Sequence, residues 1–228
     1  MSFSINRQAA DSSPGNPKFT ISKAPALKEW AVVCKALESG RQTILLRKGG
    51  IMEYRQGFEV KHNDFFLYPT FEHQSKEYLQ SDYLNEVDTI LGNRPVSNWN
   101  TIRTYAKAVE VRETNNERLL QQLRQFHIWN DHYVNIRLNY NPKRPMSVIL
   151  LRVYKMSKPL EIENRPEFAG CKSWIPIPSS NSVCEPSSDI DNMQHTPNRL
   201  DSGIGHIQPV LADSEFSEIV ANIRMVLD

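Results

Sequence analysis

Apolar residues near the start of the chain recur at the three- and four-residue spacing of one helix face. They are Leu27, Trp30, Ala31, Cys34 and Leu37. Pro25 is compatible with the first turn of a helix, and Gly40 follows the last apolar residue as a C-terminal stop. The pattern therefore predicts a helix from Ala24 to Gly40.

Short apolar runs bounded by turn residues predict strands. The runs are Thr43–Arg47, Phe58–Val60, Phe65–Tyr68, Ile102–Arg112 and Ser147–Met156. The last run is densest in β-branched and apolar residues, which predicts a central strand. Gly49-Gly50 marks a turn after the first run, and the pattern of Glu72–Leu91 indicates a mostly helical segment that ends at Gly92.

Two further helices are predicted from their first turns. Thr114 and Glu117 have the spacing of a capping box, and the helix after them would bury Leu119, Leu120, Leu123 and His127. Asp213 is a plausible N-cap for a helix at the end of the chain. Six apolar residues there share one helical face: Phe216, Ile219, Val220, Ile223, Val226 and Leu227. Such a face predicts that the helix docks on the rest of the protein.

The order of these elements predicts an α+β fold: a single mixed domain with a small sheet, several helices, a disordered insert and a C-terminal docking helix. Residues 1–23 are polar and predict a disordered N-terminal arm, followed by the α+β domain over residues 24–177. Ser, Asn, Pro and Asp dominate residues 178–208, which predicts the insert. Residues 209–228 form the C-terminal helical segment.

Composition limits the classes of function. The 228 residues carry Lys+Arg 27 and Asp+Glu 26, so nucleic acid would be attracted only by a local cluster of charge. Three widely spaced cysteines argue against a disulfide framework and fit a reducing cytoplasm. No apolar run approaches the roughly 18–20 residues of a membrane span, so no membrane partner is expected.

Charged and aromatic residues mix around two turns, which is typical of a polar site on a rigid frame. In the segment Leu46–Ile51 the candidate binding residues are Arg47 and Lys48. In the segment Phe65–Gln74 they are His73 and Gln74. Four histidines lie in the ordered region, and His127 joins these candidates, but no histidine spacing matches a metal motif and no metal ligand is predicted.

Residues 133–160 hold six cations and no Asp or Glu, interleaved with Tyr133, Tyr140 and Tyr154. The cations are Arg137, Lys143, Arg144, Arg152, Lys155 and Lys158. Cations contact phosphates and aromatic rings stack on bases, so the segment is a candidate nucleic-acid surface, with Arg137, Arg144, Arg152 and Lys155 as binding residues. The equally weighted alternative is that these cations pair with the acidic Tyr78–Asp88 segment.

Glu59 and Lys61 match the second half of a metal-dependent nuclease motif, in which a carboxylate holds Mg²⁺ and a lysine stabilises charge. They are the candidate catalytic residues, and Mg²⁺ is expected as a cofactor only under this hypothesis. A solvated pair on one strand face is the commoner reason for that spacing. Whether the protein is an enzyme stays open.

Several motifs resemble a bacterial family catalogued as domain of unknown function 1802. They are Ala26–Trp30, Arg47–Ile51, Phe65–Gln74, His127–Trp129, Gly170–Trp174 and Pro209–Phe216. The resemblance implies a context in restriction-modification, because related domains are joined to a restriction-endonuclease-like domain. A restriction-type nuclease is therefore a candidate partner, although this chain has no room for that extra domain.

Gly40-Arg41-Gln42-Thr43, followed by Arg47, is also similar to the ASCH group of PUA-like RNA-binding barrels, although the usual Lys and Glu positions of that group differ here. A helix-ending glycine before an ordinary strand is the alternative. The leading hypothesis is a nucleic-acid-interacting accessory module linked to restriction-modification or defence. The rivals are a Mg²⁺-dependent nuclease and a PUA-like RNA-binding or protein-interaction module.

Overall fold

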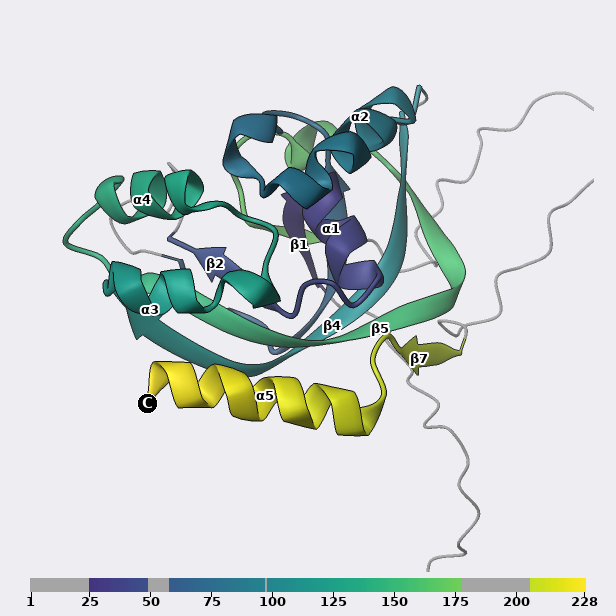
Figure 1. Cartoon of the computed structure of the whole chain (residues 1–228). Helices are drawn as coiled ribbons and strands as arrows, with labels where there is room; N and C mark the ends of the chain where they lie inside the picture. The colour runs from purple at the N-terminus through teal and green to yellow at the C-terminus, as the bar shows by residue number, and fades with distance from the viewer. Residues whose placement is uncertain (1–24, 49–57, 97, 178–205) are drawn as a thin grey trace, which may run out of the picture.

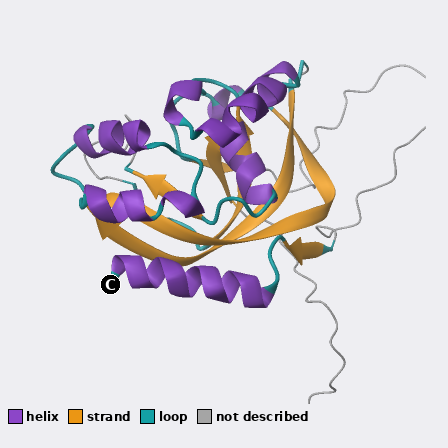
Figure 2. Cartoon of the chain, viewed as in Figure 1, coloured by secondary structure: helices purple, strands orange, loops and turns teal. Residues whose placement is uncertain are grey.

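The computed structural model describes residues 25–48, 58–96, 98–177 and 206–228 (Figure 1). A curved sheet occupies the centre, and helices pack on it (Figure 2). The expected N-terminal arm, the Gly49-Gly50 turn and residues 178–205 of the expected insert lie outside the described residues. The predicted fold class, a mixed α+β domain with a C-terminal helix, is confirmed.

Seven strands in the described part of the chain form one sheet in the order β2-β5-β4-β3-β1-β6, and β7 also pairs with β5. The strands are β1 Pro25–Trp30, β2 Ile44–Arg47, β3 Asp64–Thr70, β4 Trp99–Thr114, β5 Met146–Glu163, β6 Trp174–Pro176 and β7 Ile207–Pro209. β1 and β3 run parallel, and Trp30 lies opposite Thr70 at their shared end. The other pairs are antiparallel.

Helices cover the sheet. They are α1 Ala31–Glu38, α2 Leu84–Gly92, α3 Glu117–Gln122, α4 Asp131–Asn139 and α5 Asp213–Leu227, with 3₁₀ turns at Lys76–Tyr78, Ser81–Tyr83, Arg124–Phe126 and Pro166–Phe168. α5 runs along the β4–β5 pair, on the other side of it from α1, α3 and α4 (Figure 1). Its predicted apolar stripe packs on the main core, with Ile223 buried, so the docking prediction is confirmed.

The predicted helix from Ala24 to Gly40 is wrong in its first half. Residues 25–30 form β1, which lies inside the sheet between β3 and β6 and buries Ala26 and Leu27 on opposite faces. A strand buried on both faces lacks the alternation of polar and apolar residues that identifies a half-buried strand. Only the second half, α1, is helical, and it ends as predicted before Gly40, whose φ of 75° favours glycine.

Two further predictions are corrected. Within Glu72–Leu91 only α2 is α-helical. The backbone N–H of Gln80 donates to the Ile128 carbonyl, and the Gln80 side-chain amide donates to the carbonyls of His127 and Trp129. These bonds hold the segment before α2 against the chain that precedes α4. Phe58–Val60 is an irregular segment and not a strand, although Phe58 is buried.

The predicted helix caps also differ from the structure. Asn116, not Thr114, caps α3, and its side-chain oxygen accepts from the backbone N–H groups of Arg118 and Leu119. Asp213 is the first residue of α5 and not its N-cap, and its carboxylate pairs with Arg152 instead. Both helices form where they were predicted, but Asn116 caps the first turn of α3 and the N-cap of α5 is Ala212.

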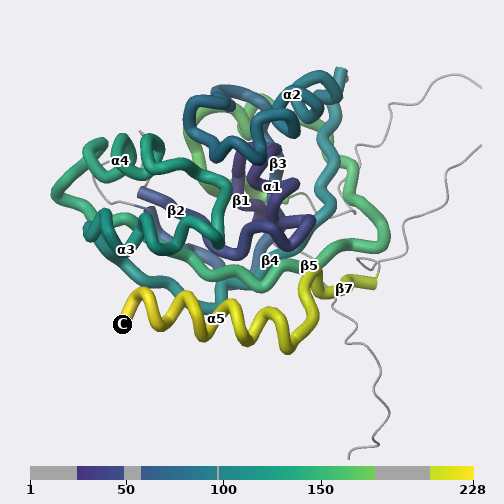
Figure 3. The backbone as a smooth tube through the Cα atoms, viewed as in Figure 1, coloured from purple at the N-terminus to yellow at the C-terminus, as the bar shows by residue number. Residues whose placement is uncertain are grey.

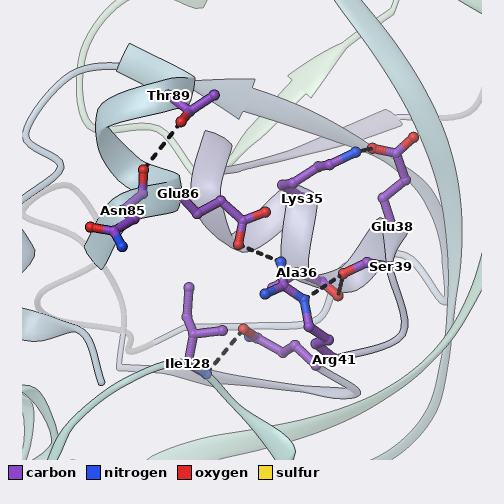
Figure 4. Close-up of polar contacts among 10 residues, drawn as sticks. Lys35, Ala36, Glu38, Ser39, Arg41, Asn85, Glu86, Thr89 and Ile128 are labelled. Atoms are coloured by element: carbon purple, nitrogen blue, oxygen red, sulfur yellow. Dashed lines mark hydrogen bonds and ion pairs between the residues drawn. The ribbon is translucent and has the colours of Figure 1, made fainter. Parts of the chain in front are cut away.

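The Gly40–Thr43 motif is a structural turn between α1 and β2, whose path Figure 3 traces. Arg41 donates to the Ser39 hydroxyl at 3.1 Å and pairs with Glu86 of α2 (Figure 4). Gln42 donates to the Ile44 carbonyl at 2.8 Å and accepts from the Ile128 N–H. The motif residues therefore join α1, α2 and the 126–128 segment.

Candidate ligand-binding cleft

A cleft of about 390 Å³ opens beyond the shared end of the parallel strands β1 and β3. Trp30 ends β1 and Thr70 ends β3, and both line the cleft. α4 supplies one wall, and the loop at 170–173, just before β6, supplies another. The parallel pair therefore brings four distant stretches of sequence to one place.

The floor of the cleft holds a largely buried ion pair. Arg47 Nη1 lies 2.9 and 3.1 Å from the two carboxylate oxygens of Glu29, and Arg47 Nη2 donates to the Ser173 hydroxyl at 2.9 Å. Glu29 is 7% exposed. Burial raises the pKa of Glu29, and Arg47 opposes that shift. The pair fixes the floor, and its two charges cancel one another.

Lys28 crosses from β1 to the 170–173 wall. Its ammonium donates to the carbonyl oxygens of Phe168 at 2.7 Å and Gly170 at 2.8 Å. Partial burial lowers the pKa of Lys28, while Glu72 favours its charged form. Gly170 has a φ of 80°, which favours glycine, and this conformation turns the loop towards the lysine. Lys172 is exposed at the mouth of the cleft.

Four aromatic rings line the cleft on and around the α4 wall. Trp129 stacks on Tyr133 with ring centroids 4.0 Å apart, and Trp30 meets the edge of Trp129 at 5.0 Å. Tyr78 packs against Tyr133 at 5.9 Å. Trp129 is 2% exposed and lies behind the others, whereas Trp30, Tyr78 and Tyr133 are partly exposed. The partly exposed rings can contact a ligand, and Trp129 supports them.

Polar side chains behind this wall hold its rings in place. The Gln80 amide donates to the carbonyls on either side of Ile128, and the Asn130 amide donates to the carbonyls of Glu77 and Leu79. Asn130 N–H donates in turn to the Tyr78 carbonyl. These bonds fix the 77–80 turn against the start of α4, so Tyr78 and Trp129 keep their relative positions.

The rim contains a residue with unusual backbone geometry. His73 has a φ of 59°, in the left-handed region that few non-glycine residues adopt and in which histidine is enriched. Gln74 follows it, and its side-chain oxygen accepts from the Val32 N–H in the first turn of α1 at 3.0 Å. That bond anchors the rim to α1, while His73 stays exposed.

The charges lining the cleft favour an anion. Four cationic side chains line it, Lys28, Arg47, Arg137 and Lys172, against the two carboxylates of Glu29 and Glu72. Cationic side chains therefore outnumber carboxylates in the lining by two. Because the whole chain has a formal charge of only +1, the cationic character is local to this cleft.

Three of the predicted binding residues, Arg47, His73 and Arg137, come together in the cleft. Gln74 lies directly behind the rim as the cap of α1. Lys48 is 2% exposed, and its ammonium donates to the Leu138 carbonyl. His127 is also 2% exposed and lies outside the cleft lining. Its Nδ1 accepts from the Trp129 N–H at 3.2 Å.

The rest of the basic segment points elsewhere. Arg152 is buried, pairs with Asp213, and lies 4.6 Å from the centre of the Phe216 ring of α5. Lys155 lies 3.7 Å from Glu38, and Arg144 is exposed in the turn after α4. The acidic Tyr78–Asp88 segment pairs with cations from other parts of the chain: Arg41 pairs with Glu86, and Lys76 pairs with Asp88.

The candidate catalytic residues Glu59 and Lys61 are exposed in the irregular segment before β3. Lys61 N–H donates to the Glu59 carbonyl at 3.0 Å, and Trp174 Nε1 donates to the same oxygen at 3.1 Å. The two side chains therefore do not share a strand face. Within the described ranges, no group of three His, Cys, Asp or Glu side chains is placed to hold a metal ion.

Sequence reasoning missed Lys28, Glu29, Trp30, Tyr78 and Lys172 as cleft residues. The helical spacing of the apolar residues predicted that Lys28 and Trp30 lie on a helix. In the structure they lie on a strand, where they flank Glu29 at the end of β1. The only available signal was the number of charged and aromatic residues at these positions. Their convergence depends on the parallel β1–β3 pair, for which the sequence contains no local motif.

A family model described as "Domain of unknown function (DUF1802)" matches residues 26–195. No curated protein matches the chain. Two crystal structures from Zymomonas mobilis are similar, one described as ASCH and one as a serine-to-alanine mutant of ZmASCH. The ASCH structure is 12% identical, with 88% of this chain and 95% of that chain covered and a TM-score of 0.40. The mutant is 14% identical over 64% and 78%, with a TM-score of 0.39.

Proposed function

The chain belongs to the family described as domain of unknown function 1802, and we propose that this member is a nucleic-acid-binding module whose ligand occupies the cleft beside β1 and β3. One observation carries the proposal: cations and partly exposed aromatic rings line the same cleft. Cations neutralise phosphates, and aromatic faces stack on bases of any identity.

The charge balance supports this ligand class over a neutral metabolite or a cationic peptide. Four cationic side chains line the cleft against two carboxylates, so its lining carries a formal excess of two positive charges. A neutral ligand would gain nothing from that excess, and a cationic one would be repelled. None of the described helices is long and apolar enough to cross a membrane.

The family resemblance supports a wider setting for the same module. We propose that it acts as an accessory in restriction-modification or defence, in the cytoplasm, beside a restriction-type nuclease on a separate chain. The cleft would hold nucleic acid, and the partner would cut it. The test is a pull-down with this protein as bait. Capture of the nuclease only when nucleic acid is added would support this setting. Equal capture without nucleic acid would contradict the proposal that this protein holds the nucleic acid for its partner.

A salt series tests the binding site. The double variant Arg137→Gln with Lys172→Ala removes two cations from the cleft, so the slope of log affinity against log salt should fall by about 0.7–0.9 for each phosphate that is no longer neutralised. The measurement is fluorescence anisotropy with labelled single-stranded RNA and DNA. The affinity of the double variant for nucleic acid should fall, while its thermal unfolding midpoint should change no more than that of the control variant.

The matched control is Arg144→Ala with Lys155→Ala, which removes the same charge outside the cleft. If the control flattens the salt slope and the cleft variant does not, the ligand contacts Arg144 or Lys155 and not the cleft. Affinity weaker than millimolar for every nucleic acid at low salt would overturn the proposed function.

A further inference from the structure

We propose that the cleft accepts one unpaired nucleotide, with its base against Trp30, Tyr78 and Tyr133 and its phosphate against Arg137 and Lys172. This inference rests on the proposed function and specifies its ligand. It separates a protein that takes up a single nucleotide unit from one that follows a duplex backbone.

The size of the site favours a single unit. The volume of about 390 Å³ lies near the lower end of the range of roughly 300–1,000 Å³ for small-molecule sites. In a duplex the bases are stacked on one another inside two phosphate backbones, so no base face away from the duplex ends is available to a protein ring. Only an unpaired base can reach the partly exposed rings of this wall.

The chemistry of the walls separates base from phosphate. Trp129 is buried behind Tyr133, and the hydrogen bonds of Gln80 and Asn130 hold Tyr78 beside it, so the aromatic wall is formed in advance. Lys172 comes from the 170–173 loop, and Arg137 lies one helical turn after Tyr133 on α4, so the cations that line the cleft are separate side chains from its rings. A nucleotide has the matching distribution, with a flat apolar base at one end and a negative charge at the other.

Aromatic rings beside carboxylates can also enclose a quaternary ammonium. Here Glu29 is already paired with Arg47 at 2.9 Å, and the lining holds twice as many cations as carboxylates. A bound ammonium would lie among like charges. Choline is the probe for that alternative, and saturable binding of choline that displaces the oligonucleotide would overturn the proposal.

The test compares four ligands by anisotropy at one salt concentration. They are a single-stranded oligonucleotide, the same strand in a blunt duplex, the same strand with abasic residues, and free adenosine monophosphate as competitor. We expect the intact single strand to bind at least about tenfold more tightly than the duplex or the abasic strand, because each of these lacks an available base. Displacement by the monophosphate would identify a free nucleotide as sufficient. If the monophosphate does not displace the oligonucleotide but the single strand is still preferred, the ligand is a nucleotide within a strand.

Tyr78→Ala removes one ring from the wall, and without that stacking interaction single-strand binding should weaken between about 5-fold and 150-fold. Tyr78→Phe keeps the ring and should bind within about twofold of the native protein. The abasic strand should bind native protein and Tyr78→Ala equally. Because the abasic comparison uses native protein, it remains decisive even if Tyr78→Ala unfolds.

Failure of this inference differs from failure of the proposed function. Equal affinity for single strand, abasic strand and duplex, with a salt slope that still depends on Arg137 and Lys172, would overturn the single-nucleotide site and leave a backbone-binding module. Absence of binding to every nucleic acid would overturn both.

Discussion

His127 is a buried histidine whose environment opposes protonation. Burial lowers its pKa from an ordinary 6.5 to about 4, although the Leu120 carbonyl and Asp131 act in the opposite direction. Nδ1 accepts a backbone hydrogen bond, so in the neutral ring the proton lies on Nε2. The side chain is therefore a neutral polar group packed two residues before Trp129, and its role in binding stays a prediction.

This histidine should make the protein less stable in weak acid. Because the folded pKa lies below the unfolded one, its contribution is complete above pH 6.5 and is lost as the pH falls towards 4. From pH 7 to pH 4.5 the loss should reach about 2–3 kcal/mol of unfolding free energy. Urea unfolding at both values measures it. His127→Gln should remove that part of the pH dependence, and an unchanged slope would show that other groups cause it.

Glu59 and Lys61 are exposed, so the nuclease hypothesis can be tested without disturbing the fold. If Glu59 holds Mg²⁺, Glu59→Gln and Lys61→Ala should each abolish Mg²⁺-dependent cleavage of DNA or RNA. Both variants should unfold within about 0.5 kcal/mol of the native protein, because exposed substitutions seldom cost more. Cleavage assays in Mg²⁺ and Mn²⁺ decide the matter. Native protein that cuts neither substrate would end the hypothesis.

At the scale of elements, α5 is held by an unequal ion pair. The Arg152 side chain is 7% exposed, whereas its partner Asp213, in the first turn of α5, is 95% exposed. The guanidinium also lies against the Phe216 ring at 4.6 Å. The helix thus supplies both a carboxylate and an aromatic face to a cation that the sheet has buried.

Asp213→Asn should lower the unfolding free energy by about 1 kcal/mol, because a buried guanidinium loses its carboxylate but water reaches the replaced side chain. The matched control is Asp228→Asn at the other end of α5, where the pair with Arg112 is exposed on both sides. That change should cost less than about 0.5 kcal/mol. Denaturant unfolding of both variants gives the comparison, and equal costs would refute a special role for Arg152.

Elements were predictable from the sequence where their apolar residues formed one clear run or recurred at one spacing. β2, β3, β4 and β5 lie where their apolar runs indicated, and the stripe of α5 packs as expected. β1 was not predictable, because its apolar residues face both sides of the sheet and happen to continue the spacing of α1. The 72–83 segment was missed because its hydrogen bonds go to residues near 128, and a local pattern contains no signal for distant partners.

At the scale of the whole molecule, the candidate cleft was only partly visible in the sequence. Arg47, His73 and Arg137 were predicted as binding residues, and they do lie together. Arg152 has the same charge and a similar local context, yet it is buried under α5. Residue type therefore indicated what kind of chemistry to expect, while the packing of the elements determined which cations share a cleft.

The position of β1 inside the sheet has a consequence for how the protein is made. β1 precedes both of its neighbours along the chain, which are β3 and β6, and β6 ends only at Pro176. Such distant pairings are slow to form because a long loop must close first. The wall at 170–173 emerges just before β6, so a nascent chain lacks a complete cleft until Ser173 has been translated, long after β1.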